Sequence, residues 1–180
     1  MVDILRATIP RSDGVGLRGA RPSPESLSSA DQAFSQAMDL NDQLQPQLAV
    51  AYLRRALELT PGHARAAVEL GATLCDVGDP ASACEVYEAF LARAPETSMV
   101  RMGLASCLLR SGDVEEAVVH YRRCVRDTPT WLEPYPKLIV ALCRLGQLAE
   151  AREALTRYVD QEPDPRSVKM LEAVLARRSG

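Results

Sequence analysis

The chain has 180 residues, a net charge of −3 and a hydrophobic share of 47%, which is enough for one domain with a buried core. The acidic balance argues against a nucleic-acid partner, because phosphate binding usually requires a basic surface. No apolar run reaches the roughly 18 residues that a membrane span requires. Residues 1–29 also lack the apolar core of a signal peptide. We therefore expect a cytoplasmic protein.

Residues 1–29 contain Gly, Ser or Pro every few positions and no sustained hydrophobic period. We expect this tail to be disordered unless it is bound by a partner. The tail also contains a short apolar cluster of Val2, Ile4, Leu5 and Ile9. A second hypothesis is therefore that it docks into a groove of the protein itself or onto a partner. Ser28 and Ser29 can cap a helix that begins near Ala30.

From Ala30 onward, apolar residues recur at helical spacing. Pro134 and Pro136 fit the first turn of a helix, where their missing N–H groups remove no hydrogen bond. The predicted helices span residues 30–43, 46–60, 64–77, 80–94, 98–111, 114–128, 132–145, 148–162 and 166–178.

Glycines and aspartates mark the turns between these helices. Gly78, Gly112 and Gly146 each follow a predicted helix, where a left-handed backbone suits glycine. Asp79 and Asp113 come next and can cap the helix that follows. The pattern indicates pairs of helices joined by tight turns.

A fixed interval of 34 residues separates four prolines, Pro61, Pro95, Pro129 and Pro163. The same interval separates four alanines, Ala49, Ala83, Ala117 and Ala151, and four leucines, Leu40, Leu74, Leu108 and Leu142. An interval of 34 is the length of one helix–turn–helix repeat. The chain is therefore predicted to be a stack of such repeats, closed by a terminal helix that covers the last apolar face.

These phased residues resemble the tetratricopeptide repeat family. The second repeat matches best, with Leu70, Gly71, Leu74, Ala83, Tyr87 and Pro95. The resemblance implies an all-α, right-handed superhelical solenoid. Its four repeats would span residues 30–63, 64–97, 98–131 and 132–165, with a capping helix over 166–178.

Small residues of the first helices are expected to allow close packing of each helix pair. Gly71, Ala37 and Ala105 are predicted to face the phased alanine of their own second helix. Ile139 occupies the same place in the fourth repeat and departs from the pattern. We expect that pair to be splayed or repacked.

The resemblance further implies that the first helices line a concave groove that holds a peptide or helix of another protein. An apolar floor edged by charges of both signs favours an amphipathic helix or an extended apolar peptide. The lysine, asparagine and arginine pattern of family members that bind the acidic C-terminus of chaperones is not matched in either repeat register. The candidate groove residues are Phe34, Met38, Arg65, Val68, Glu69, Ala72, Met99, Met102, Ser106, Arg110, Lys137, Val140 and Arg144.

Catalysis and cofactor binding have no support in the residue pattern. His63 and His120 are expected to have no nucleophile or carboxylate beside them, and there is no Gly-rich phosphate loop. Five cysteines form neither a C-x-x-C pair nor a zinc-ligand spacing, so we expect them to behave as small buried residues: Cys75, Cys84, Cys107, Cys124 and Cys143. No metal or cofactor is predicted.

Two functions remain. The leading hypothesis is a non-catalytic adaptor or chaperone that binds a protein or peptide partner. The alternative is a structural scaffold that self-assembles through its convex face or its ends, which would make the protein a homo-oligomer. Arginine supplies nearly all the positive charge, since Lys137 and Lys169 are the only lysines. This bias is typical of GC-rich bacterial coding DNA.

Overall fold

The computed structural model describes residues 21–161 and 163–178. All regular elements in these ranges are helices: η1 (Pro24–Ser26), α1 (Ala30–Asp42), α2 (Pro46–Leu59), α3 (Ala64–Asp76), α4 (Pro80–Leu91), α5 (Ser98–Ser111), α6 (Val114–Asp127), α7 (Pro134–Arg144), α8 (Leu148–Val159) and α9 (Pro165–Arg178). The ends of the predicted helices agree with these bounds to within three residues. None of the helices in the described ranges is long and apolar enough to cross a membrane.

Local chemistry explains where the helices start. Pro46, Pro80 and Pro134 occupy the first turns of α2, α4 and α7, where an N–H group has no partner to lose. The Ser29 Oγ accepts a hydrogen bond from the Gln32 N–H, so the predicted cap of α1 is confirmed. The Asp79 carboxylate caps α4 in the same way through the Ser82 N–H. Hydrogen bonds from the side chain and the backbone N–H of Ser82 lower the pKa of Asp79.

Two of these predictions needed correction. Asp113 occupies the cap position of α6, but its side chain makes no cap hydrogen bond. The helix predicted to start at residue 132 starts at Pro134 instead, and Glu133 stands at its N-cap. Glu133 already has helical backbone angles, φ −58° and ψ −36°, so the two starts differ only in where the first hydrogen-bonded turn begins.

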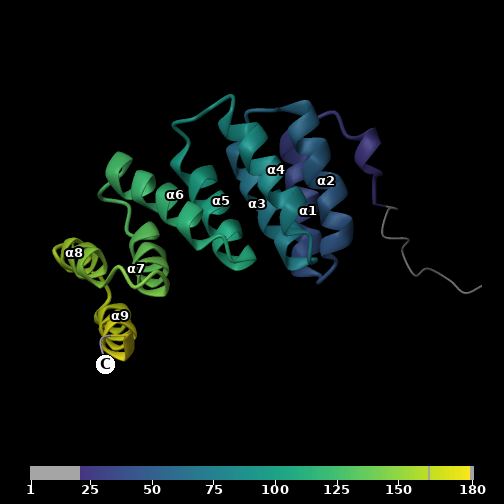
Figure 1. Ribbon diagram of the computed structural model, residues 1–180. Helices are drawn as coiled ribbons and strands as arrows, with labels where there is room; N and C mark the ends of the chain where they lie inside the picture. The colour runs from purple at the N-terminus through teal and green to yellow at the C-terminus, as the bar shows by residue number, and fades with distance from the viewer. Residues whose placement is uncertain (1–20, 162, 179–180) are drawn as a thin grey trace, which may run out of the picture.

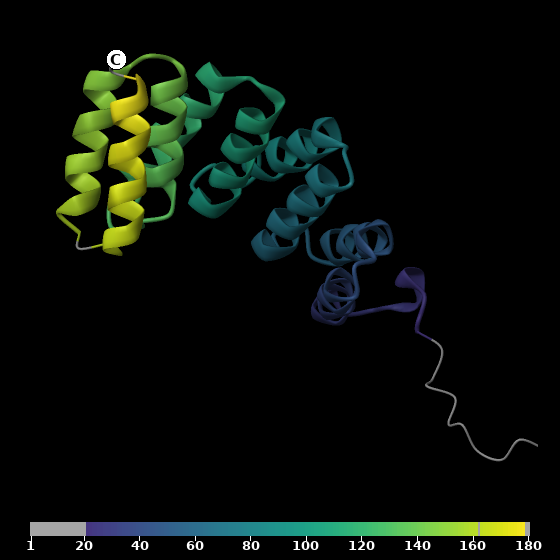
Figure 2. The ribbon, with the colours of Figure 1, turned by 90° about the horizontal axis from the view of Figure 1, so that it is seen from below.

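The helices pack as consecutive antiparallel pairs, α1 on α2, α3 on α4, α5 on α6 and α7 on α8. Each second helix also packs on the first helix of the next pair, and α3, α5, α7 and α9 follow one another in direct contact. The pairs form a curved stack that ends in α9 (Figures 1 and 2). We call the side formed by α1, α3, α5 and α7 the first-helix face, and the side formed by α2, α4, α6 and α8 the second-helix face.

The 34-residue phase of the sequence coincides with the core. The phased alanines Ala49, Ala83, Ala117 and Ala151 are fully buried. The phased leucines Leu40, Leu74, Leu108 and Leu142 are buried as well. One continuous apolar cluster runs from Leu27 to Leu175 through every helix pair. The predicted register and the all-α solenoid are therefore confirmed.

The side chain nearest to Gly71 is that of a tyrosine of the second helix, Tyr87. A Cβ atom on Gly71 would overlap the Tyr87 ring, and one on Gly103 would lie 2.7 Å from Tyr87 Cε1. The Tyr87 hydroxyl donates to the Val68 carbonyl at 3.1 Å. The ring of Tyr87 thus lies against α3 and α5, and these two glycines make room for it.

Part of the tail that was expected to be disordered is folded onto α2. The Tyr52 hydroxyl donates to the Pro22 carbonyl at 2.6 Å, and Arg55 donates twice to the Leu27 carbonyl at 3.0 and 3.2 Å. Leu27 is buried. Two long polar side chains of α2 therefore fix residues 22–27, although their sequence shows no period. The apolar cluster of residues 2–9 lies outside the described residues.

Candidate functional site

The thirteen candidate groove residues all lie on the first helices, and none of them is buried. The apolar members Phe34, Met38, Val68, Met102 and Val140 pack on the core with one part of the side chain and remain partly exposed. Met99, at the start of α5, is 38% exposed. The first-helix face therefore presents apolar side chains that are held in place and still accessible.

At the N-terminal end of this face, an aromatic and cationic cluster joins α1 to α3. The Arg65 guanidinium carbon lies 5.0 Å from the centre of the Phe34 ring, within the range of a cation–π interaction. The His63 ring lies 5.1 Å from Phe34. His63 Nδ1 accepts from the Ala66 N–H, and its Nε2 lies 3.5 Å from an Asp31 oxygen.

The expectation that no carboxylate lies beside His63 was therefore wrong. Its Nδ1 accepts a backbone hydrogen bond, so the proton lies on Nε2, toward Asp31. These contacts make His63 a helix cap and a packing partner of Phe34. A nucleophile is not among the contacts described for this histidine.

A polar chain crosses from α5 to α7 in the middle of the face. The Lys137 ammonium donates to the Ser106 hydroxyl at 3.2 Å, and Ser106 Oγ donates to the Met102 carbonyl at 2.9 Å. The Tyr121 hydroxyl lies 2.9 Å from the same oxygen. Burial raises the pKa of Tyr121 to about 12, so its phenol stays protonated and can donate to Ser106. Ser106 thus links α5, α6 and α7 and has little capacity left for a ligand.

A cleft of about 380 Å³ lies between α5 and α7, beside the hydrogen bond from Lys137 to Ser106. Two of its residues, Met102 and Lys137, belong to the predicted set. Most of the lining is apolar, with Glu133 and Lys137 supplying one charge of each sign. The lining residues are Met102, Leu132, Glu133, Pro136, Lys137 and Tyr158.

Sequence reasoning missed Leu132, Pro136 and Tyr158 as parts of this cleft. Tyr158 comes from α8, a second helix, and its ring centre lies 6.0 Å from that of Tyr135. The Tyr135 hydroxyl donates to the Pro129 carbonyl at 2.9 Å. A tyrosine reaching the cleft from a second helix leaves no periodic signal on the first helices. Pro136 could have been predicted as a cleft residue from the sequence. A proline in the first turn of a helix makes no helical hydrogen bond, and its apolar ring is free to line a surface.

Two of the predicted groove arginines have partners inside the protein. The Arg110 guanidinium donates to the Cys75 carbonyl at 2.9 Å and to Asp76 Oδ1 at 3.2 Å. The Arg144 guanidinium donates to the Leu109 carbonyl at 3.2 Å. Both side chains remain exposed. Their described contacts therefore connect consecutive first helices.

Three cysteines form a cluster that the spacing did not predict. Cys107 Sγ lies 3.1 Å from Cys75 Sγ and 3.4 Å from Cys84 Sγ. Burial raises the pKa values of the Cys107 and Cys84 thiols, so both are protonated at neutral pH. Cys84 is half-buried, and the other four cysteines are buried as predicted. No group of three or more potential metal ligands suited to an ion occurs within residues 21–161 and 163–178.

The fold and the aligned first helices define a helical-repeat solenoid with an accessible first-helix face. Two tetratricopeptide repeat family models match this chain, one over residues 73–130 and the other over residues 137–165. A TPR repeat-containing protein of Pseudomonas aeruginosa, PA0015, is 36% identical over 70 residues, which are 39% of this chain and 67% of that protein. The chain belongs to the tetratricopeptide repeat family.

A second relative is much longer than this chain. The TPR repeat-containing thioredoxin TTL4 of Arabidopsis thaliana is 30% identical over 97 residues, which cover 54% of this chain and 14% of that protein.

Solved structures share the fold at lower identity. MamA superposes with a TM-score of 0.67 at 17% identity, covering 83% of this chain and 84% of its own. YrrB, described as a TPR protein with an unusual peptide-binding site, superposes with a TM-score of 0.66 at 20% identity, covering 86% of this chain and 80% of its own. Pseudomonas aeruginosa pilF superposes with a TM-score of 0.71 at 20% identity, covering 83% of this chain and 68% of its own. At these identities the likeness establishes the architecture.

Proposed function

We propose that this protein is a non-catalytic adaptor that binds an apolar peptide or an amphipathic helix of a client protein along its first-helix face. The observation that carries the proposal is the cleft between α5 and α7, which Met102, Leu132, Pro136 and Tyr158 line with apolar surface. Apolar clefts with a few placed polar groups are the usual form of a peptide site. The peptide-binding site attributed to YrrB supports the same use of this fold.

Methionines suit a surface that must fit an irregular apolar partner. Met99 and Met102 lie three residues apart on α5, so they share one side of the helix. The unbranched thioether side chain of methionine adapts to different shapes. Glu133 and Lys137, four residues apart near the start of α7, place opposite charges beside the cleft. Such charges orient a bound segment more than they strengthen its binding.

We also propose a finer role, as an adaptor or chaperone in the cytoplasm of a bacterium, for a client with an exposed apolar segment. The Pseudomonas aeruginosa relative supports the bacterial assignment. Each methionine that the client covers would contribute by removing apolar area from water, at about 25 cal/mol per Å².

The test is an affinity pull-down with the native organism's lysate and mass spectrometry. Wild type is compared with a Met99→Glu, Met102→Glu double variant, and circular dichroism confirms that both are folded. Met170→Glu is a matched control, because Met170 lies on α9 and is 57% exposed. A client that wild type and Met170→Glu retain and the double variant loses supports the groove. Equal retention by all three proteins contradicts it.

Self-assembly into a scaffold is the second candidate. It is favoured by Val159 and Met170, which are 43% and 57% exposed on the last two helices. Exposed apolar side chains at the end of a repeat stack are suited to contact with another copy. Light scattering over a hundredfold concentration range distinguishes the two functions. A growing series of oligomers that Met170→Glu suppresses favours assembly, and a constant mass favours the adaptor.

A further inference from the structure

A second cleft, of about 270 Å³, lies on the second-helix face, away from the proposed groove. Five of its six lining residues are basic, and none is acidic. Most of them project from α6. The lining residues are Arg101, Val119, His120, Arg122, Arg123 and Arg126. A concentration of arginine around one cleft is unexpected in a protein whose net charge is −3.

Arg101 is the unusual member of this group. Its position in the repeat holds Ala33, Ala67 and Tyr135 in the other repeats, and all four residues are buried. Arg101 is only 4% exposed, and its Nη2 atom makes no hydrogen bond within the described part of the chain. A buried polar group without a partner is costly, and more so when it is charged. Burial, with a further contribution from Arg123, lowers the pKa of Arg101, yet a guanidinium stays protonated at physiological pH.

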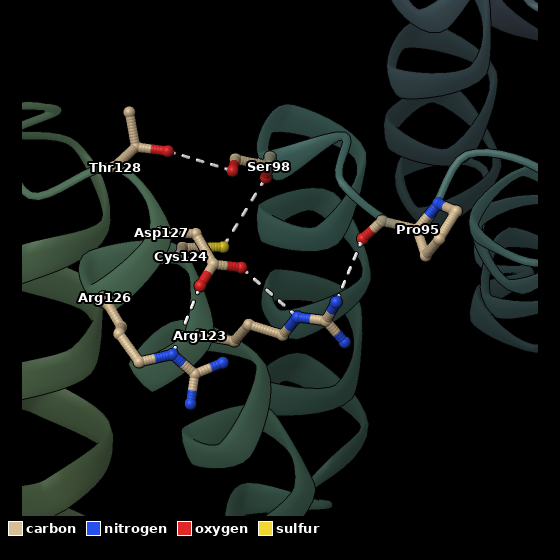
Figure 3. Close-up of polar contacts among 7 residues, drawn as sticks. All are labelled: Pro95, Ser98, Arg123, Cys124, Arg126, Asp127 and Thr128. Carbon is tan, nitrogen blue, oxygen red and sulfur yellow. Dashed lines mark hydrogen bonds and ion pairs between the residues drawn. The ribbon is translucent and has the colours of Figure 1, made fainter.

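The carboxylates of Asp127 and Glu150 are already paired with neighbouring arginines. Arg123 Nε donates to one oxygen of Asp127 at 3.3 Å, and Arg126 Nε donates to the other at 3.2 Å (Figure 3). Arg123 also reaches the Pro95 carbonyl at 3.5 Å (Figure 3). Arg122 is paired with Glu150, with Nε and Oε1 2.7 Å apart. Asp127 therefore binds two arginines, and among residues 21–161 and 163–178 no carboxylate forms an ion pair with Arg101.

An adjoining cleft of about 340 Å³ shares Arg101, His120 and Arg123 with the first. Leu91, Ala92 and Leu104 supply apolar surface there. Glu88 and Glu116 also line this second cleft, and they would repel a second negative group. The two clefts together fit one anionic group with an apolar neighbour.

We infer that the paired clefts form a binding site for a single oxyanion, a carboxylate or a phosphate, with Arg101 as its buried ligand. The planar guanidinium fork matches both anions. Arg101 lines both clefts, so its guanidinium would hold the anion, and Arg123 and Arg126 would add charge at the rim. The site is independent of the proposed groove, because none of its residues belongs to the first-helix cleft.

Side-chain NMR of the full chain, labelled with ¹⁵N-arginine, tests the inference. The probes are inorganic phosphate, the blocked tripeptide acetyl-Leu-Asp-Leu-amide and its Asn counterpart, all at matched ionic strength in chloride. We expect the Arg101 Nε–H resonance to shift saturably with phosphate or with the Asp peptide, and not with the Asn peptide. If the Asp peptide binds at least tenfold more tightly than phosphate, the natural ligand is a carboxylate of a protein partner. If phosphate binds as tightly as the Asp peptide or more tightly, the natural ligand is a free anion. No saturable shift, or the same shift with the Asn peptide, overturns the site.

Variants at residue 101 separate binding from folding. Arg101→Met removes the charge at a position that holds apolar residues in the other repeats, so its melting temperature without anion should equal or exceed that of wild type. The rise in melting temperature that saturating phosphate or Asp peptide gives wild type should be lost in Arg101→Met. It should be kept in Arg93→Met, an exposed control. Arg101→Lys, which keeps the charge without the fork, should weaken the NMR-measured affinity severalfold. An anion-induced rise that persists in Arg101→Met contradicts the assignment.

Discussion

Arg110 and Arg144, which lie 34 residues apart, make the same contact with the helix one repeat earlier. Arg110 donates to the Cys75 carbonyl at 2.9 Å, and Arg144 donates to the Leu109 carbonyl at 3.2 Å. Both carbonyls lie in the last turn of a first helix, where the helix dipole favours a cation. An arginine thus connects consecutive first helices at the same position of the third and fourth repeats.

Replacing both arginines should weaken the stack without exposing core. We expect the Arg110→Met, Arg144→Met double variant to lose about 1–2 kcal/mol of unfolding free energy, because three charge-assisted hydrogen bonds are lost from exposed side chains. Urea denaturation followed by circular dichroism measures the change. Arg93→Met, at an exposed position of the α4–α5 loop, is the control, and a double variant as stable as this control would contradict the role.

Leu44 stands where the other three repeats have glycine. Its backbone φ is +56°, against +89°, +99° and +72° at Gly78, Gly112 and Gly146. A leucine is strained in this left-handed region, and the Leu44 side chain is 88% exposed, so it contributes little packing. We expect Leu44→Gly to raise the unfolding free energy by about 1 kcal/mol, and the melting temperature should rise accordingly. Gly78→Leu should have the opposite effect, and a neutral or destabilising Leu44→Gly would show that the strain is absent.

Gly71 should tolerate no side chain. Because a Cβ there would overlap the Tyr87 ring, Gly71→Ala should cost about 2–3 kcal/mol by overpacking. Gly62→Ala is the matched control, since a Cβ on Gly62 would meet nothing within 4 Å. Thermal melts measure both. Combining Gly71→Ala with Tyr87→Leu should restore part of the loss, and strictly additive effects would mean that Tyr87 is not the obstacle.

The buried thiols should make stability fall at alkaline pH. Burial raises the pKa of Cys124 to about 11, and it also raises the pKa values of Cys84 and Cys107. An unfolded cysteine ionises near pH 8.5, so the unfolded state loses protons first. The stabilising contribution is therefore complete below about pH 8.5 and is lost as the pH rises through the folded values.

Urea midpoints at pH 7.5 and pH 10 measure this effect. We expect a lower midpoint at pH 10, and a smaller decrease in Cys124→Ala. Native protein at pH 7.5 should also react with iodoacetamide far more slowly than denatured protein. Rapid alkylation of Cys107 in the native state would show that its thiol is accessible and ionised.

The periodic features of the structure could be predicted, and the contacts between repeats could not. The 34-residue interval between residues such as Ala83 shows which side of each helix is buried. The interval between prolines such as Pro95 shows where each second helix ends, so the helix bounds could be predicted. Arg110 looked like a groove residue because its phase places it on the first-helix face. Its contact with Cys75 depends on where a long side chain turns once two helices are packed. Tyr158 entered the cleft from a second helix for the same reason.

Arg101 was overlooked although the sequence carries a signal for it. A charged residue stands at a position where the other repeats have alanine or tyrosine, and this departure marks a buried cation once the phase is known to be buried. Residues 22–27 carried no such signal, because their order comes from Tyr52 and Arg55 of α2.

Site-specific photocrosslinking tests the groove most directly. A benzophenone amino acid replaces Met102 in one protein and Met170 in another, and both are irradiated in the native organism before mass spectrometry. We predict that position 102 crosslinks one client through an apolar segment, and that position 170 does not crosslink that client. A client captured from position 170 and not from 102, or only copies of this chain captured from 102, would contradict a client-binding first-helix face.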